Sequence, residues 1–550
     1  MANLNLKHDK ELLIGIDFGT TNCAVSLHLE GEPVIIPIDG ANTFPTAIMF
    51  EPDSEEEGKL LFSFGSTAKE AATIYPESTV LSIKRYLTGN KKIKIYVDDN
   101  EYDFSPWEIA GEVLAYIKEQ AQDYLLEELS LNAAIKGAVI TVPANSTDKQ
   151  KQMTKRAAIL AGFDEDKIFL RPEPAAAAIT YALEENNDKN ILVYDFGGGT
   201  FDACILKVEA GEKEPQISIL STYGENELGG DDIDKIVMDI IYEEFKKQTD
   251  NEIDLFDTEE EPAFRRRQKK MAVARLEQIS RRAKERLSVA KSTKITLAPF
   301  IQEPRIVNIN MEISRETFLT HRRQNPLGDS AEHFEKFQNK NLEDLIDITI
   351  KCVDNCIKTA GIEEINEIFL VGGSSSIVRI EEVIKEKLKK EIFKSKISPA
   401  LSISLGAATY ANLLLSPVAT GPRVKEVTLH PLGLEVAGRR FEEIVKSGQE
   451  IPKEGLTVEA KEPFATNFDN LTSMAIVVYE DTAPDEDKST ARDGMKRLAA
   501  TSLRGIPPGP KGQEKVKIIF TVSQDNMLKV RALSTGDLGL ETELLVDELY

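Results

Sequence analysis

A glycine-rich turn between two aspartates is the feature that most constrains how this chain folds. Residues 191–205 read ILVYDFGGGTFDACI: an apolar run, Asp195, three glycines and a threonine, then Asp202 before apolar residues resume. Glycines permit positive φ and close backbone approach, so the N–H groups of such a turn can surround an anion. Carboxylates on both sides would repel a bare phosphate, which indicates a divalent cation between them. Taken alone, the stretch is equally well a plain β-hairpin.

A second copy of this pattern favours the phosphate interpretation. Residues 12–25 read LLIGIDFGTTNCAV, again an apolar strand, Asp-Phe-Gly, hydroxyl side chains and an apolar strand. Asp17 and Asp195 stand 178 positions apart (195 − 17). We therefore expect two related lobes that face each other across a cleft and clamp a phosphate group, with chance duplication of a turn as the alternative.

These two loops resemble the phosphate loops of the ATPase fold shared by actin, sugar kinases and heat-shock chaperones. The residues of these motifs are most similar to those of DnaK-type heat shock protein 70 chaperones, and the resemblance covers roughly the whole chain. It continues, in order, through Val142-Pro-Ala144, Arg171–Ala178, Glu227–Asp232, Phe369–Ser374 and Ser404–Ala408. The resemblance implies an α/β two-lobed actin-like ATPase domain, built on ribonuclease H-like repeats, followed by a β-sandwich domain.

Composition excludes several other classes of protein. The 550 residues carry a net charge of −25, which argues against general nucleic-acid binding and against anionic membrane surfaces. No stretch approaches the roughly 20 apolar residues of a membrane span, and the first ten residues lack the apolar core of a signal peptide. Four cysteines provide no disulfide framework. We expect a cytoplasmic protein that binds neither nucleic acid nor membranes.

The pattern of the chain changes after Leu415. Residues 1–415 mix helical and strand periods, residues 416–426 have the Pro- and Gly-containing composition of a linker, and residues 427–550 alternate with period two between turn residues. We interpret these as the ATPase domain, an interdomain linker and a substrate-binding β-sandwich. In the family a helical lid follows the sandwich; since the sequence stops at Tyr550, we expect a short, lidless member.

One helical region raises a separate question. Residues 232–292 are expected to be helical throughout and become basic, with RRRQKK at 265–270. Such a run is either a nucleic-acid patch or the exposed face of a helix whose other face packs. We favour the helix.

The resemblance assigns the phosphate and metal residues. Asp17 and Asp195 would hold Mg²⁺ through its waters, and the phosphates of ATP or ADP would lie between two sets of residues, which are Gly19, Thr20, Thr21 and Asn22 on one side and Gly197, Gly198, Gly199, Thr200, Gly229 and Gly230 on the other. The residues expected to support a slow ATP hydrolysis are Lys84, Glu173, Asp195, Thr200 and Asp202.

The adenosine side departs from the family pattern. The resemblance places adenosine against Lys284, Ser288, Gly372, Gly373 and Ser374. Ser375-Ser376 stands where the family has Thr-Arg, and Arg281 stands where it has a ribose-binding glutamate. The phosphate contacts look complete and the base and ribose contacts look altered, and ATP remains the expected nucleotide.

Communication between the domains and peptide binding also follow from the resemblance. Pro143 matches a switch proline, and Lys151 stands in place of the arginine that works with it, which keeps the charge and loses the planar fork. The peptide groove would be formed by Leu434, Val436, Phe464, Met474 and Ile476. The alternative is that these side chains simply form the sandwich core.

The sequence thus predicts an ATP-dependent, DnaK-like chaperone that binds unfolded or extended polypeptides, with a J-domain co-chaperone and a nucleotide exchange factor as possible partners. Two other functions are considered. A metabolite kinase on the same ATPase fold would not explain the appended sandwich. A nucleotide-gated scaffold with one dedicated partner would suit the altered linker and the expected absence of a lid.

Overall fold

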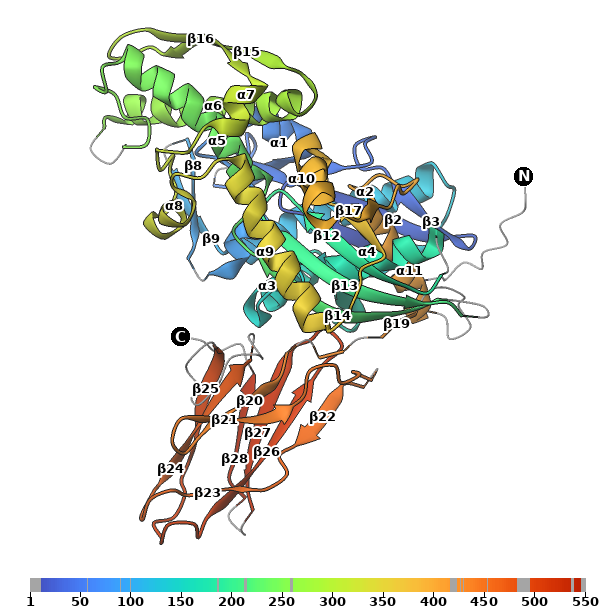
Figure 1. Ribbon diagram of the computed structural model, residues 1–550. Helices are drawn as coiled ribbons and strands as arrows, with labels where there is room; N and C mark the ends of the chain where they lie inside the picture. The colour runs from blue at the N-terminus through green and yellow to red at the C-terminus, as the bar shows by residue number, and fades with distance from the viewer. Residues whose placement is uncertain are drawn as a thin grey trace.

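The computed structural model describes residues 11–545, except positions 57, 90, 99, 185–186, 212–214, 258–260, 416–422, 426, 429, 453, 482–494 and 536–538. It shows an α/β body with a β-sandwich attached to one end (Figure 1). None of the helices in these described ranges combines the length and the apolar character needed to cross a membrane.

The first lobe is built on a six-stranded sheet with the order β11-β10-β1-β2-β3, to which β4 adds through β2. Helix α2 begins with a capping box formed by Ser105 and Glu108, and its apolar face packs on this sheet. The elements are β1 (Glu11–Phe18), β2 (Asn22–Leu29), β3 (Glu32–Ile36), β4 (Phe44–Pro45), β10 (Ala134–Val142), β11 (Ile168–Pro172), α2 (Pro106–Glu127), α3 (Asp148–Leu160) and η2 (Glu165–Lys167).

The second lobe repeats this topology in a sheet with the order β18-β17-β12-β13-β14-β19. In each sheet the strand that ends in Asp-Phe pairs antiparallel with the next strand and parallel with a later one, β10 for β1 and β17 for β12. Its strands are β12 (Lys189–Phe196), β13 (Phe201–Glu209), β14 (Gln216–Glu225), β17 (Glu367–Val371), β18 (Glu391–Ile392) and β19 (Arg423–Lys425). The duplicated motif therefore marks a duplicated lobe.

Two helices separate the sheets. Helices α4 (Glu173–Glu184) and α11 (Ser402–Leu415) pack together in a core that also takes residues from both sheets, among them Leu13 and Val193. The approach is close, because a Cβ at Gly406 would collide with the backbone of Ala176 and one at Gly15 with that of Ala408.

Each lobe carries an outer part above the cleft. On the first lobe this part contains β5 (Ala47–Pro52), β6 (Leu60–Phe64), α1 (Gly65–Ala71), β7 (Thr79–Leu81), η1 (Ile83–Thr88), β8 (Ile93–Val97) and β9 (Asn100–Phe104). On the second it contains α5 (Gly230–Gln248), α6 (Ala263–Val289), β15 (Ser292–Ile301), β16 (Val307–Ser314), α7 (Arg315–Thr320) and α8 (Ala331–Phe337). Further along the chain come α9 (Leu342–Ala360), η3 (Gly373–Ser376) and α10 (Val378–Leu388).

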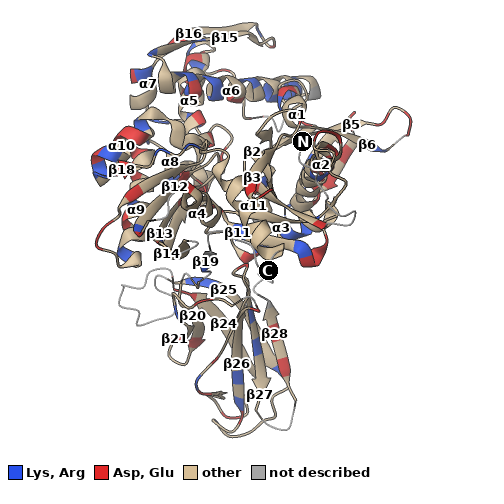
Figure 2. Ribbon diagram, turned by 90° about the vertical axis from the view of Figure 1, so that its right-hand side faces the viewer, with Lys and Arg blue, Asp and Glu red and all other residues tan. Residues whose placement is uncertain are grey.

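The expectation of continuous helix over residues 232–292 is wrong. Helix α5 ends at Gln248, Asp250 and Asn251 adopt positive φ, and α6 begins only at Ala263. The basic run does lie in a helix, α6, and its charges have acidic neighbours, with Lys269 on Glu261 at 2.7 Å and Lys270 on Glu77 at 2.8 Å. Both signs of charge accordingly surround α5, α6 and α7 (Figure 2), as expected for a helix face and not for a nucleic-acid patch.

The sandwich consists of a four-stranded sheet, β21-β20-β24-β25, and a five-stranded sheet, β22-β26-β27-β28, to which β23 adds through β26. Alternating side chains of the two sheets form a separate core. The strands are β20 (Leu432–Val436), β21 (Arg440–Val445), β22 (Leu456–Glu459), β23 (Phe464–Ala465), β24 (Ser473–Glu480), β25 (Lys496–Arg504), β26 (Lys515–Val522), β27 (Leu528–Ser534) and β28 (Glu541–Leu545).

The segment before the sandwich is partly described. Of the predicted linker 416–426, residues 423–425 form β19, which extends the second lobe's sheet parallel to β14. The other positions of the predicted linker, 416–422 and 426, lie outside the described residues. The linker composition therefore did not reveal that this stretch adds a strand to the ATPase body.

Candidate nucleotide site

The two Asp-Phe-Gly turns close two β-hairpins that meet at the bottom of the cleft. In the second hairpin the register pairs Asp195 with Asp202 and Phe196 with Phe201, so the glycines form the turn between them. The hairpin interpretation is therefore correct, and it is compatible with the phosphate-loop interpretation, which stays a prediction. The loops touch: a Cβ at Gly198 would collide with the hydroxyl of Thr21.

A pocket of about 420 Å³ lies between the loops and collects most of the predicted residues. Gly199, Gly229 and Asp202 are not in its lining, but Gly199 and Gly229 are next in sequence to lining residues, and Asp202 pairs with the lining residue Asp195 across the hairpin. The predicted residues that line it are Asp17, Gly19, Thr20, Thr21, Asn22, Lys84, Glu173, Asp195, Gly197, Gly198, Thr200, Gly230, Lys284, Ser288, Gly372, Gly373 and Ser374.

A buried lysine–glutamate pair stands at the centre of the site. Lys84 Nζ lies 2.5 Å from Glu173 Oε1, and the two side chains are only about a tenth exposed. Lys84 comes from η1 and Glu173 from the first residue of α4. Burial would lower the pKa of Lys84, but the carboxylates of Glu173 and Asp17 outweigh it and raise that pKa. Lys84 is therefore a fixed positive charge.

Three aspartates share this buried space with one lysine. Burial and Glu173 raise the pKa of Asp17 to about 7 and that of Asp202 to about 8, with Lys84 opposing both shifts. Burial, Glu173 and the other two aspartates raise the pKa of Asp195 as well. Such clusters are typical of sites where a cation neutralises the carboxylates.

Two buried polar atoms in the cleft, Asp195 Oδ2 and Thr21 Oγ1, have no hydrogen-bond partner among the described residues. Buried polar groups are otherwise nearly always paired. An unpaired carboxylate oxygen suits the water shell of Mg²⁺, which takes oxygen ligands and keeps several of its waters, and an unpaired hydroxyl suits a phosphate oxygen. The donor set therefore fits a magnesium–phosphate group.

The glycine turn is braced by the start of α5 and by η3. The amides of Gly230 and Asp231 donate to the carbonyls of Gly197 and Gly198 at 3.0 and 2.9 Å. The Ser374 hydroxyl also donates to the Gly197 carbonyl, at 2.8 Å, and Lys284 Nζ donates to the Gly230 carbonyl at 3.0 Å. Lys284 and Ser374 thus brace the phosphate loop besides lining the pocket.

The residues that depart from the family pattern on the predicted adenosine side lie in the pocket. Arg281, Glu285 and Ser376 all line it. Arg281 is committed to two aspartates, Asp231 at 3.0 Å and Asp234 at 3.2 Å. This part of the pocket is charged by side chains of both signs.

Sequence reasoning missed Arg85 and Asp231. Arg85 reaches across the cleft from η1, with Nε 3.5 Å from Asp231 and Nη2 3.4 Å from Asp232. Arg85 follows the predicted Lys84 directly, and Asp231 follows the predicted Gly230. Their partnership could not be read from a chain in which they are far apart.

The predicted switch residues lie where the sandwich meets the first lobe. Lys151 Nζ donates to the carbonyl of Asn526 at 2.9 Å, and Pro143 lines a cavity of about 410 Å³ between the domains. Arg171, which is 2% exposed, lies 2.8 Å from Asp525 and stacks on the ring of Tyr410.

The predicted groove residues divide into two groups. Leu434 and Ile476 are 4% exposed and belong to the sandwich core. Phe464 and Met474 are half-buried and pack against that core, and Val436 is half-buried at the end of β20. The core alternative thus holds for the first two, and a groove remains a prediction.

Comparison with known proteins agrees with this geometry. The sequence model of the family described as "Hsp70 protein" matches residues 13–324 and 328–547. A protein named "Chaperone protein DnaK" from Thermosipho melanesiensis is 34% identical over 549 residues, which is 98% of this chain and 80% of that protein.

Proposed function

The chain belongs to the Hsp70 family, and from this premise we propose how its own residues perform the activity. It is an ATP-dependent molecular chaperone with actin-like ATPase lobes and a β-sandwich. The family match continues through residues 328–547, which contain the sandwich, so neither a metabolite kinase nor a dedicated scaffold is favoured.

The observation that carries the proposal is the clamp around the Lys84–Glu173 pair. On one side Thr20 and Thr21 present hydroxyls, and on the other the glycine turn presents backbone amides. ATP would place its β- and γ-phosphates between them. Phosphoryl transfer to water requires mainly positioning and charge stabilisation, which these fixed groups supply.

Asp17 and Asp195 would hold Mg²⁺ through its waters. The ion would supply positive charge to the β- and γ-phosphates and thereby also favour the ionised forms of the nearby carboxylates. The single unpaired oxygen of Asp195 is the group best placed for this role.

The catalytic residues then have separate tasks. Lys84, held by Glu173 at 2.5 Å, would stabilise the negative charge that develops on the transferred phosphoryl group. Asp202 and Glu173 are the carboxylates that would orient the attacking water and accept its proton. Thr200, which ends the glycine turn, would hold a phosphate oxygen.

We further propose that the domain contact transmits the nucleotide state. Strand β19 ties the linker to β14, while Arg171 and Lys151 hold the loop that contains Asp525 and Asn526. Arg171 precedes Glu173 by two residues, so a shift at the phosphate site has a short covalent route to the interface. The clients would be unfolded or extended polypeptides bound by backbone hydrogen bonds and a side-chain pocket.

The test measures ATP hydrolysis by the whole chain in three conditions: alone, with a panel of unfolded peptides, and with a J-domain protein. We expect slow hydrolysis that peptides and the J-domain protein stimulate. If neither the peptides nor the J-domain protein changes the rate of hydrolysis, and the chain captures one tightly bound partner, the scaffold is supported instead. The matched inactive control is Lys84→Ala.

A further inference from the structure

The segment between α7 and α9, residues 321–341, is fastened to helix α5 by two histidine–aspartate pairs. His321 Nε2 lies 2.8 Å from Asp239, and His333 Nε2 lies 2.8 Å from Asp232. The two aspartates are seven residues apart on α5, which is close to two helical turns, so they share one face. Both histidines are mostly buried, with side chains 14% and 12% exposed.

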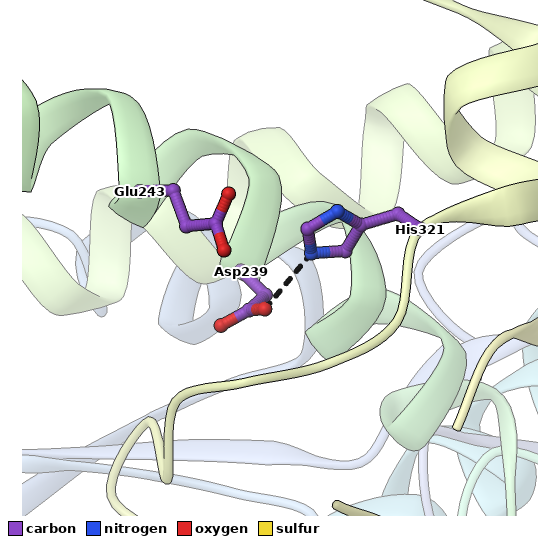
Figure 3. Close-up of side chains that lie close together, drawn as sticks. All are labelled: Asp239, Glu243 and His321. Atoms are coloured by element: carbon purple, nitrogen blue, oxygen red, sulfur yellow. Dashed lines mark hydrogen bonds and ion pairs between the residues drawn. The ribbon is translucent and has the colours of Figure 1, made fainter. Parts of the chain in front are cut away.

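The outer pair, which is His321 with Asp239, is a structural contact that leaves no open position on its carboxylate. Asp239 accepts four hydrogen bonds, which are from His321 and the Gln324 amide at one oxygen and from the backbone and side chain of Asn325 at the other. Figure 3 shows His321 on Asp239 with Glu243 beside them, close enough to resemble a metal site. Because four donors already fill the lone pairs of Asp239, a cation would have to displace them.

The inner pair leads to the nucleotide cleft. Besides His333, Asp232 accepts the backbone amide of Gly229 at 2.9 Å, which caps the start of α5 beside the phosphate loop. It also receives Arg85 Nη2 at 3.4 Å from the opposite lobe. His333 is therefore one contact away from a link between the lobes.

Arg85 lies against the phosphate loops themselves. A Cβ at Gly199 would meet its guanidinium and the hydroxyl of Thr20. Asp232 is 2% exposed, and burial acts to raise its pKa, but the hydrogen bond from His333 and the charge of Arg85 outweigh burial and lower it. Asp232 is thus an ionised carboxylate held by His333 and the Gly229 amide in its own lobe and by Arg85 from the other.

We propose that His333 is a positioning residue for nucleotide retention. By holding Asp232 towards both Gly229 and Arg85, it keeps the two lobes joined beside the phosphate loops and slows release of ADP. The inference rests on the proposed function, since it assigns a regulator to that same site. The same proposal assigns a role to residues 321–341, which would hold α5 in place at the cleft through His333.

The two pairs supply a matched experiment. Dissociation of a fluorescent ADP analogue with Mg²⁺ is followed by stopped flow for the whole chain, His333→Ala and His321→Ala. Each substitution removes a histidine–aspartate bond of 2.8 Å between mostly buried side chains, and His333→Ala also removes a 3.7 Å contact with Asp329, so both should lower thermal stability. Only His333→Ala should speed release, by about fivefold for the loss of one such hydrogen bond.

Two further variants test the route. In His333→Gln the side-chain amide can replace Nε2 as a donor, so release should return close to the rate of the unaltered chain. In an Arg85→Met background, His333→Ala should add little, because the link that it supports is already gone. A Gln variant as fast as the Ala variant, or an undiminished effect in the Arg85→Met background, would overturn the inference.

The outcomes also separate this inference from the proposed function. If the unaltered chain does not bind the ADP analogue, the proposed function fails. If it binds and both alanine variants release the analogue at the same rate, the positioning role of His333 fails and the proposed function stands.

Discussion

Replacing Asp202 with asparagine is predicted to make the nucleotide-free chain more stable at alkaline pH. The Asp202 side chain is buried, with 1% of the residue exposed, and shares its surroundings with Glu173. Burial and Glu173 raise its pKa from 3.8 to about 8, although Lys84 and the backbone amides of Ala144 and Asn145 act in the opposite direction. The ionised form of Asp202 therefore destabilises the folded chain, at a position that we propose to be catalytic.

The direction of the pH dependence follows from the two states of the chain. Unfolded, Asp202 loses its proton near pH 4; folded, it keeps that proton up to about pH 8. Between these values the folded state binds more protons, so its stability falls as pH rises and levels off above pH 8. One pKa unit corresponds to about 1.4 kcal/mol, so this group removes about 2 kcal/mol between pH 6 and pH 8.

The measurement can be confined to the ATPase domain, because Trp107 in α2 is the single tryptophan. Denaturant unfolding is followed by its fluorescence at pH 6 and pH 8, with a chelator and without nucleotide. The unaltered chain should lose about 2 kcal/mol more than Asp202→Asn between the two pH values. Asp123→Asn, at an exposed position of α2, is the control and should behave like the unaltered chain. Equal losses of stability in all three chains would refute the conclusion that the raised pKa of Asp202 destabilises the folded chain at high pH.

Three further substitutions test the site and the domain contact. Lys84→Ala should keep nucleotide binding and slow single-turnover hydrolysis by about 100-fold, because it removes a preorganised charge; an unchanged rate would exclude the role of Lys84. Asp195→Asn should weaken binding of ATP with Mg²⁺ far more than binding of ATP in a chelator, as compared by calorimetry, and equal losses would argue against a metal role. Asp525→Ala leaves the buried Arg171 without its carboxylate, which costs about 3 kcal/mol in such pairs. Peptides should then cease to stimulate hydrolysis while the basal rate persists, and retained stimulation would mean that coupling does not use this contact.

The parts of the fold that the sequence predicted are those with a local signature. The hairpins at Asp17 and Asp195 follow from an apolar strand that ends in a glycine-containing turn. The prediction of a continuous helix over residues 232–292 was wrong because it, too, relied on a local pattern alone. Helical spacing resumes in α6 after the break at Asp250 and Asn251, and spacing alone does not show an interruption.

What the sequence could not predict depends on partners distant in the chain. Strand β19 forms because the edge of β14 is available to it, although its own three residues carry little strand signal. Arg85 matters through Asp231 and Asp232, and His333 through Asp232, at separations that no motif spans. Single charged residues on helices carry no sign of which lobe they will meet.

The phosphate side and the adenosine side of the cleft differ in how tightly the fold specifies them. At the proposed phosphate side the backbone geometry is tightly defined: the register that pairs Asp195 with Asp202 determines the glycine turn, and added Cβ atoms would collide with the opposite loop. Few sequences satisfy those conditions, which is why the motif could be read from the chain. At the proposed adenosine side the pocket is lined by side chains of α6, and Arg281 is already bonded to Asp231 and Asp234. Its departure from the family pattern is thus absorbed by partners within the second lobe and leaves the phosphate clamp intact. The proposed phosphate site therefore does not depend on the side chains that differ at the proposed adenosine site.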